Sequence, residues 1–275
     1  MEIEVLIILF SLLLGSCVGS FINVVIFRLP RDISVIVPRS KCLRCNKQIK
    51  WFDNIPLLSW ILLRGKCRYC SQRISFQYPL IEIITALFFL LSNYANPLPL
   101  ENNSQQVIVV AGWIFASILL SLSVIDINTF LLPEKLLRVG FITGICIILL
   151  GSLGLQFINS LIFLLSHLAA MIIGFVCFEV LRILGSAIFR KPAMGQGDSK
   201  LVSLIGLWLG IKGLGISVYI AFIISGTLAI IALLLKIIKS GQKIPFGPFL
   251  SLGGLIVWYF GNDTLIDLFF KNRIY

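Results

Sequence analysis

The chain has 275 residues, of which 58% are hydrophobic and only 13% are charged, and its formal net charge is +11. Soluble domains have about 45–50% apolar and about 25% charged residues, so this composition excludes an ordinary soluble domain and predicts a membrane protein. The positive charge does not require a nucleic-acid partner, because basic loops orient membrane proteins.

Long uncharged apolar segments recur along the chain, and a helix needs about 20 such residues to cross the hydrocarbon core of a bilayer. The segments cover 5–27, 83–100, 107–125, 139–178, 201–211, 213–235 and 244–262. The fourth is long enough for two spans. We therefore expect an all-α polytopic membrane protein with about eight transmembrane helices. The first segment is a retained span rather than a cleaved signal peptide, because it is too long and follows the acidic residues Glu2 and Glu4.

The distribution of Lys and Arg predicts the orientation. Residues 28–78 carry 11 Lys or Arg against two Asp or Glu, which places this segment in the cytoplasm. Alternating spans then put 20 of the 23 basic residues on the cytoplasmic side. Lys200 and Lys236 share that side, so the chain between them must cross an even number of times. We expect 201–211 to form a short or re-entrant helix.

Four cysteines lie in the first cytoplasmic loop as two Cys-x-x-Cys pairs. Cys42 and Cys45 are followed, after 21 residues, by Cys67 and Cys70. This spacing is typical of tetrahedral zinc sites. Reduced thiols, two disulfides and an iron–sulfur cluster are alternatives, and a cytoplasmic location disfavours the disulfides. Four thiolates leave no open coordination position, so we expect the zinc to be structural.

Two aspartates mark the cytoplasmic ends of apolar segments. Asp126 ends the third segment, and Asp198 precedes the segment 201–211. Either carboxylate alone could cap a helix. A carboxylate at the bilayer edge is costly, however, and two that face each other can share one proton and hydrolyse a peptide bond. We therefore interpret Asp126 and Asp198 as a candidate catalytic pair.

Residues near Asp198 are predicted to support this site. Gly195 and Gly197 permit close backbone approach and conformations that other residues avoid. Lys200 either favours the ionised form of Asp198 or faces lipid headgroups. His167, the single histidine, lies inside a span and is interpreted as a core residue, so a Ser-His or Cys-His catalytic arrangement has little support.

Two further features have structural interpretations. Glu179 and Arg182 lie three residues apart on a predicted helix and are expected to pair. The aromatic segment 51–60 is either the small core of the cytoplasmic loop or a surface anchor that uses Trp51 and Trp60, and we slightly favour the anchor.

These motifs together resemble the type IV prepilin peptidases, a family of Gly-x-Gly-Asp intramembrane aspartic proteases that also serves type II secretion and competence systems. The matching segments, which extend over nearly the whole chain, are 19–24, 28–30, the two cysteine pairs, 53–60, 64–67, 78–82, Asp126 with 132–133, 194–201 and 246–249.

The resemblance implies an inner-membrane enzyme with Asp126 and Asp198 as its catalytic residues at the cytoplasmic face. Such enzymes remove the basic leader of prepilins and pseudopilins after a glycine, and many then methylate the new amino terminus with S-adenosylmethionine. Members of this kind bind metal through the cytoplasmic cysteines, in a loop linked to methylation. We accordingly expect a first transmembrane helix over 1–27, a zinc-binding loop over 28–78 and a peptidase domain over 79–275. Oligomeric state and the residues that bind S-adenosylmethionine stay open.

Two rival functions are weighed against this one. The first is an intramembrane protease for general signal peptides, against which the cysteine loop and the 246–249 motif argue. The second is a transporter or assembly scaffold that uses the two acids as a cation relay. Inverted repeats would favour it, and the sequence contains none that can be recognised.

Overall fold

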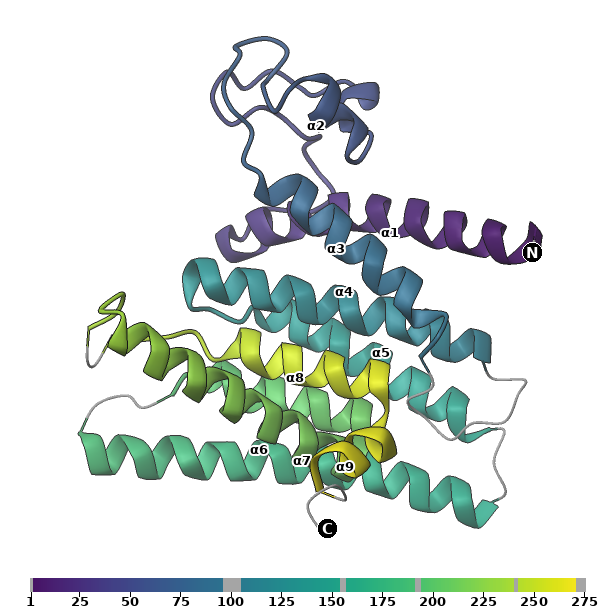
Figure 1. The fold of residues 1–275 in the computed structure, drawn as a ribbon, viewed down its shortest axis with the longest axis vertical. Coiled ribbons are helices and arrows are strands. Elements are labelled where there is room, and N and C mark those ends of the chain that lie inside the picture. The colour runs from purple at the N-terminus through teal and green to yellow at the C-terminus, as the bar shows by residue number, and fades with distance from the viewer. Residues whose placement is uncertain (1, 96–104, 154–156, 191–193, 240–241, 271–275) are drawn as a thin grey trace. The chain divides into compact units, whose positions relative to one another are not determined.

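The computed structural model describes residues 2–95, 105–153, 157–190, 194–239 and 242–270, and within these residues it is helical, with no β-strand beyond two isolated bridges. The chain forms two compact units, Met1–Tyr94 and Ala95–Tyr275 (Figure 1). The predicted all-α class is confirmed.

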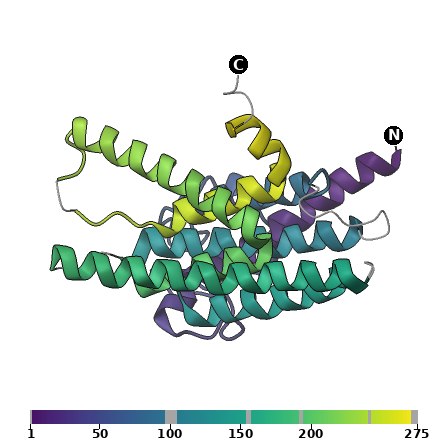
Figure 2. The same cartoon turned by 90° about the horizontal axis from the view of Figure 1, so that it is seen from below.

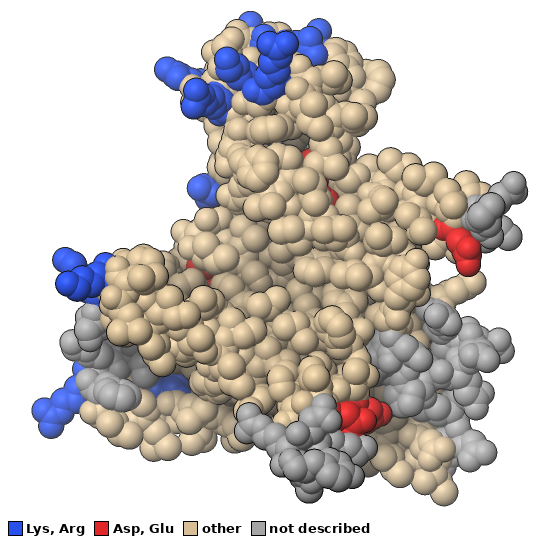
Figure 3. All heavy atoms as spheres, viewed as in Figure 1, with Lys and Arg blue, Asp and Glu red and all other residues tan. Residues whose placement is uncertain are grey.

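The first unit contains two closely packed helices, α1 (Glu2–Arg28) and α3 (Gln77–Ser92). Glycine allows their backbones to approach, because a Cβ atom at Gly15 would lie 2.6 Å from Ala86 Cα and one at Gly19 would lie 2.7 Å from Glu82 Cα. Residues 29–76 form a lobe between these helices, which we call the tetracysteine lobe. It contains η1 (Leu29–Arg31), η2 (Trp51–Asn54) and α2 (Leu58–Leu62). Lys and Arg side chains gather on its surface (Figure 3).

The second unit packs its helices around a buried aromatic cluster. The helices are α4 (Gln105–Thr129), α5 (Glu134–Ser152), α6 (Phe157–Phe189), α7 (Gln196–Leu234), α8 (Gly247–Phe260) and α9 (Asn262–Phe270). The rings of Phe115 and Trp208 stack with centroids 4.7 Å apart, and Trp258 lies 5.3 Å from Phe115. The cluster therefore joins α4, α7 and α8.

Helix α7 reverses its direction at Gly210, whose φ of 70° and ψ of −176° interrupt the helix. Before the break, Ser203 Oγ donates to Met171 O and Ser199 Oγ donates to Glu179, so the first arm runs antiparallel to α6. After the break, the Phe222 ring lies 6.3 Å from that of Phe178, so the second arm has returned to the same level of α6 (Figure 2). The reversal agrees with the even number of crossings expected between Lys200 and Lys236.

The predicted number of eight spans is not confirmed. Five described helices are long and apolar enough to cross a membrane, and α8 with α9, bent by 105°, is a sixth candidate. Two differences from the expected segments explain the gap. The segments 201–211 and 213–235 are arms of one broken element, and α3 has only 16 residues. The rest of the segment expected at 83–100 extends into residues outside the described ranges.

Gly206 provides a stability test of the α6–α7 contact. A Cβ atom there would lie 2.6 Å from the carbonyl oxygen of Ala170, so we expect Gly206→Ala to destabilise the fold by about 1–3 kcal/mol through overpacking. Gly226→Ala, on the second arm of α7, is the control, because a Cβ atom at Gly226 meets nothing within 4 Å. Thermal unfolding in detergent measures both. A Gly206→Ala protein that melts with or above the control would contradict this packing.

Candidate active site and metal centre

The structure brings Asp126 and Asp198 together in the second unit. Asp126 lies in the last turn of α4 and Asp198 in the first turn of α7. Their side chains are almost fully buried, at 6% and 9% exposure, and the two carboxylates are close enough to interact electrostatically. A buried pair of like charges is the arrangement that retains one shared proton.

Asp126 is held by the N-terminus of α8. The Gly247 N–H donates to Asp126 Oδ2 at 3.1 Å. The first N–H groups of a helix lack intrahelical partners and carry partial positive charge, so this contact stabilises a carboxylate. A Cβ atom at position 247 would lie 2.7 Å from the same oxygen, so the approach requires glycine. Sequence reasoning missed this role, although the Gly247–Pro248 start of the helix was a visible signal.

Asp198 is held by its own helix start. The Gly195 N–H donates to Asp198 Oδ2 at 3.3 Å, and the Asp198 N–H donates to Gly195 O at 3.2 Å. Gly195 has φ −74° and ψ 147°, which any residue adopts. Gly197 lies within helix α7. Neither glycine therefore adopts the unusual backbone conformation that was expected. Close approach is present instead, because a Cβ atom at Gly197 would lie 2.8 Å from Leu132 Cβ.

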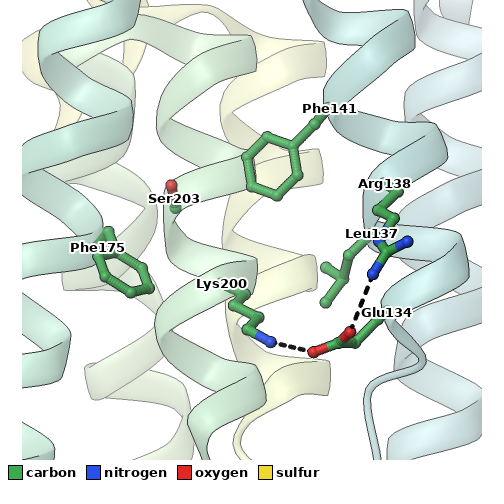
Figure 4. Close-up of a pocket in the computed structure, with 7 residues that line it drawn as sticks. All are labelled: Glu134, Leu137, Arg138, Phe141, Phe175, Lys200 and Ser203. Carbon is green, nitrogen blue, oxygen red and sulfur yellow. Dashed lines mark hydrogen bonds and ion pairs between the residues drawn. The ribbon is translucent and has the colours of Figure 1, made fainter.

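Lys200 pairs with Glu134 at the start of α5 and not with Asp198. Arg138 contacts the second carboxylate oxygen of Glu134 at 3.5 Å. These charged groups lie at one side of a pocket of about 340 Å³ (Figure 4). The pocket is lined by Glu134, Leu137, Arg138, Phe141, Phe175, Lys200 and Ser203.

The other polar residues singled out from the sequence have structural roles. Glu179 forms the predicted ion pair with Arg182, and it also accepts a hydrogen bond of 3.1 Å from Ser199 Oγ, which ties the residue after Asp198 to α6. His167 is 3% exposed, and its Nδ1 lies 2.7 Å from Leu207 O, as expected of a core histidine.

The four predicted metal ligands converge in the first unit. The Sγ atoms of Cys42, Cys45, Cys67 and Cys70 all lie within 4.8 Å of one another, and those of Cys42 and Cys70 are 3.8 Å apart. Tetrahedral zinc with Zn–S bonds of about 2.3 Å requires sulfur atoms about 3.8 Å apart. The donor set thus fits a zinc ion.

The two cysteine pairs form the same turn twice. The Cys42 N–H donates to Lys47 O, and the Cys67 N–H donates to Gln72 O. The residues after the second cysteines, Asn46 and Ser71, both have positive φ, of 55° and 54°. The sequence contained a signal that we missed, a repeat of the form Lys-Cys-x-x-Cys-x-x-x-Ile that begins at Lys41 and at Lys66.

Local hydrogen bonds lower the pKa of two groups in the lobe. Backbone N–H groups of Cys45 and Arg44 lower the pKa of Cys42 to about 6, which favours the thiolate that binds metal. Arg68 donates two hydrogen bonds to Asp53, at 2.8 and 2.6 Å, and they hold the pKa of Asp53 below its usual value.

The two tryptophans of segment 51–60 differ. Trp60 is half-buried and packs edge-on against Phe76, with ring centroids 5.8 Å apart, as the interpretation as a small loop core expects. Trp51 is 81% exposed, which suits the anchoring role that we favoured for both. Trp60 therefore fits the loop-core interpretation, and Trp51 fits the surface-anchor interpretation.

Comparison with known proteins places both units in one family. The model of the bacterial peptidase A24 N-terminal domain matches residues 13–95, and that of the type IV leader peptidase family matches residues 113–234. No solved structure matches the chain.

Curated relatives agree. A prepilin leader peptidase/N-methyltransferase of Myxococcus xanthus is 34% identical over 85% of this chain, and the match spans less than two thirds, 65%, of that relative. A type 4 prepilin-like proteins leader peptide-processing enzyme of Escherichia coli is 35% identical over 89% of this chain and 91% of its own length. A prepilin leader peptidase/N-methyltransferase of Stutzerimonas stutzeri is 32% identical over 93% and 91%. The chain belongs to the type IV leader peptidase family.

Proposed function

We propose that this protein is a prepilin leader peptidase of the inner membrane that also methylates the amino terminus it creates. The buried pair of Asp126 and Asp198 is the observation that carries the peptidase activity, because it lies inside the segment matched by the family model. Methylation is supported by relatives whose names include N-methyltransferase. The substrates are prepilins or pseudopilins, cut between a glycine and the apolar helix that follows the basic leader.

The two carboxyl groups share the work of hydrolysis. One ionised carboxylate takes a proton from a water molecule between them, and this water attacks the carbonyl carbon of the scissile bond. The other, protonated carboxyl polarises the carbonyl oxygen and then helps to protonate the leaving amine. The N–H groups of Gly247 and Gly195 each hold the Oδ2 atom of one aspartate, and we assign the Oδ1 atoms to this chemistry. Water is the nucleophile, so no acyl-enzyme forms.

The site lies where a membrane-inserted substrate would present its leader. The excess of Lys and Arg on one side supports a cytoplasmic orientation of the loop 28–78 and of both aspartates. A prepilin that keeps its basic leader in the cytoplasm and its apolar helix in the bilayer then brings the scissile bond to the carboxylates. We assign the peptidase domain to residues 79–275.

The tetracysteine lobe is proposed to hold one structural zinc ion. Cys42, Cys45, Cys67 and Cys70 would bind it as thiolates and leave no position for substrate. S-adenosylmethionine supplies the methyl group when it is bound. We propose that the lobe takes part in methylation, because this activity is linked to the same loop in the family that the sequence resembles.

The purified protein should convert a prepilin with a Gly–Phe junction into a peptide that begins with Phe and, with S-adenosylmethionine present, carries one methyl group on its amino terminus. Mass spectrometry reports the cleavage position and the methyl group together. General signal peptides that lack the junction should stay intact. An intact prepilin, or indiscriminate cleavage of both substrates, would contradict the proposal.

Gly247 provides a test of the contact that holds Asp126. We expect Gly247→Ala to reduce kcat for leader cleavage by about 100-fold, because its Cβ atom displaces the Asp126 carboxylate, and a misplacement of about 1 Å costs this much. Gly215→Ala is the control, because a Cβ atom at Gly215 meets nothing within 4 Å. Steady-state kinetics on both variants decides. Equal kcat values would show that the approach of Gly247 to Asp126 has no part in catalysis.

A further inference from the structure

The connection that follows Asp126 is tied to the helix turn that carries Asp198 by an ion pair. Glu134, the first residue of α5, pairs through Oε1 with Lys200, which is two residues beyond Asp198 (Figure 4). Arg138 reaches Oε2 of the same carboxylate, but it lies on α5 itself. Lys200 is therefore the partner that joins α5 to α7.

A second contact lies beside the first. The Leu132 side chain packs onto Gly197, where the Cβ and Cδ1 atoms of Leu132 would be 2.8 and 2.9 Å from a Cβ atom at position 197. Leu132 thus contacts Gly197, and Glu134 contacts Lys200. Gly197 and Lys200, on either side of Asp198, therefore contact Leu132 in the α4–α5 connection and Glu134 at the start of α5.

This connection is short and has little freedom. Helix α4 ends at Thr129 and α5 begins at Glu134. Phe130 takes the left-handed conformation at φ 55° and donates its N–H to Asp126 O, and Pro133 fixes the entry into α5. A displacement of Glu134 is therefore passed on to the end of α4, where Asp126 lies.

The ion pair is exposed, with side-chain exposures of 38% for Lys200 and 59% for Glu134. Exposed pairs add little to the stability of a fold. Catalysis is far more sensitive, because carboxylates that share a proton must keep their separation within a fraction of an ångström. The pair should therefore affect the catalytic rate much more than it affects folding.

We propose that Glu134 and Lys200 are positioning residues that, together with the contact of Leu132 with Gly197, set the separation of the Asp126 and Asp198 carboxyl groups. This inference rests on the proposed peptidase function. Neither residue touches the reacting atoms. The ion pair acts by holding the segment after Asp126 against the first turn of α7.

Charge reversal tests the proposal. Glu134→Lys and Lys200→Glu should each lower kcat for leader cleavage on the order of 10-fold to 100-fold with KM little changed, because geometry and not substrate binding is disturbed. The double variant, which restores the pair with opposite polarity, should recover most of the lost kcat. Arg138→Gln removes the other contact of Glu134 without touching α7 and should stay close to the unmodified protein.

Further variants keep the outcome decisive if a reversed charge prevents folding. Lys200→Arg preserves the pair and should retain kcat, whereas Lys200→Gln should lose it, with both proteins melting at the same temperature. Equal kcat values for these two, or a folded double variant no faster than the single ones, would overturn the inference. Absence of cleavage by the unmodified protein would instead refute the proposed function and is therefore distinguishable.

Discussion

Asparagine at position 126 or 198 is expected to lower the rate of leader cleavage by at least about 10²–10⁴-fold, the contribution of general acid–base catalysis. Asparagine preserves the size of the side chain and can accept the N–H of Gly247 or Gly195, but it neither takes nor gives the proton that the pair must share. Initial rates of leader removal by the purified variants measure the effect.

The double variant should be no slower than either single variant, because groups that act as one unit are not additive. Asp263→Asn, at an exposed position on α9, is the matched control and should cleave normally. Asp126→Glu and Asp198→Glu should also be slow, since the added methylene moves the carboxyl group in a buried site. Full activity of Asp198→Asn would end the two-aspartate mechanism.

Serine at Cys42 or Cys67 is expected to release the metal and to unfold the tetracysteine lobe. Of residues 29–76, all of which the structure describes, only Ser59 and Gly65 are buried, so the lobe has almost no apolar core. A structural zinc ion contributes about 10–16 kcal/mol of apparent binding free energy to such a domain. Metal analysis should find one zinc ion per unmodified chain and almost none in either variant.

Cys146→Ser is the control for this experiment, because Cys146 lies on α5 and outside the four-sulfur cluster. It should retain zinc and resist proteolysis as the unmodified protein does. The two lobe variants should be cut first within residues 29–76, while the second unit survives. Unchanged zinc content in purified Cys42→Ser protein would refute the metal assignment.

Long uncharged apolar segments and the distribution of charge located most helices of the second unit without a structure. The segment 139–178 was correctly divided into α5 and α6, and the balance of basic residues correctly required the chain to return between Lys200 and Lys236. The predicted count of eight spans is not confirmed, because the expected spans 201–211 and 213–235 are two arms of α7 and because α3 has only 16 residues.

Neighbours in space were the least predictable part of the site. Gly247 is 121 residues from Asp126, and no local pattern connects them. Lys200 stands two residues from Asp198, yet positions i and i+2 of a helix point in different directions, so Lys200 reaches Glu134 instead. Sequence patterns predicted the two aspartates and the four cysteines as site residues. The residues that contact the aspartates depend on how the helices pack, which the sequence does not reveal.

A transition-state analogue offers the most direct measurement of the central claim, the joint action of Asp126 and Asp198. In such a peptide the scissile amide of the Gly–Phe junction is replaced by a hydroxyethylene group, whose hydroxyl occupies the place of the attacking water. Calorimetry should find that the unmodified protein binds it at least about 100-fold more tightly than the Asp126→Asn and Asp198→Asn proteins, which should be weakened alike. Equal affinity for all three proteins, or a loss confined to one aspartate, would contradict the account.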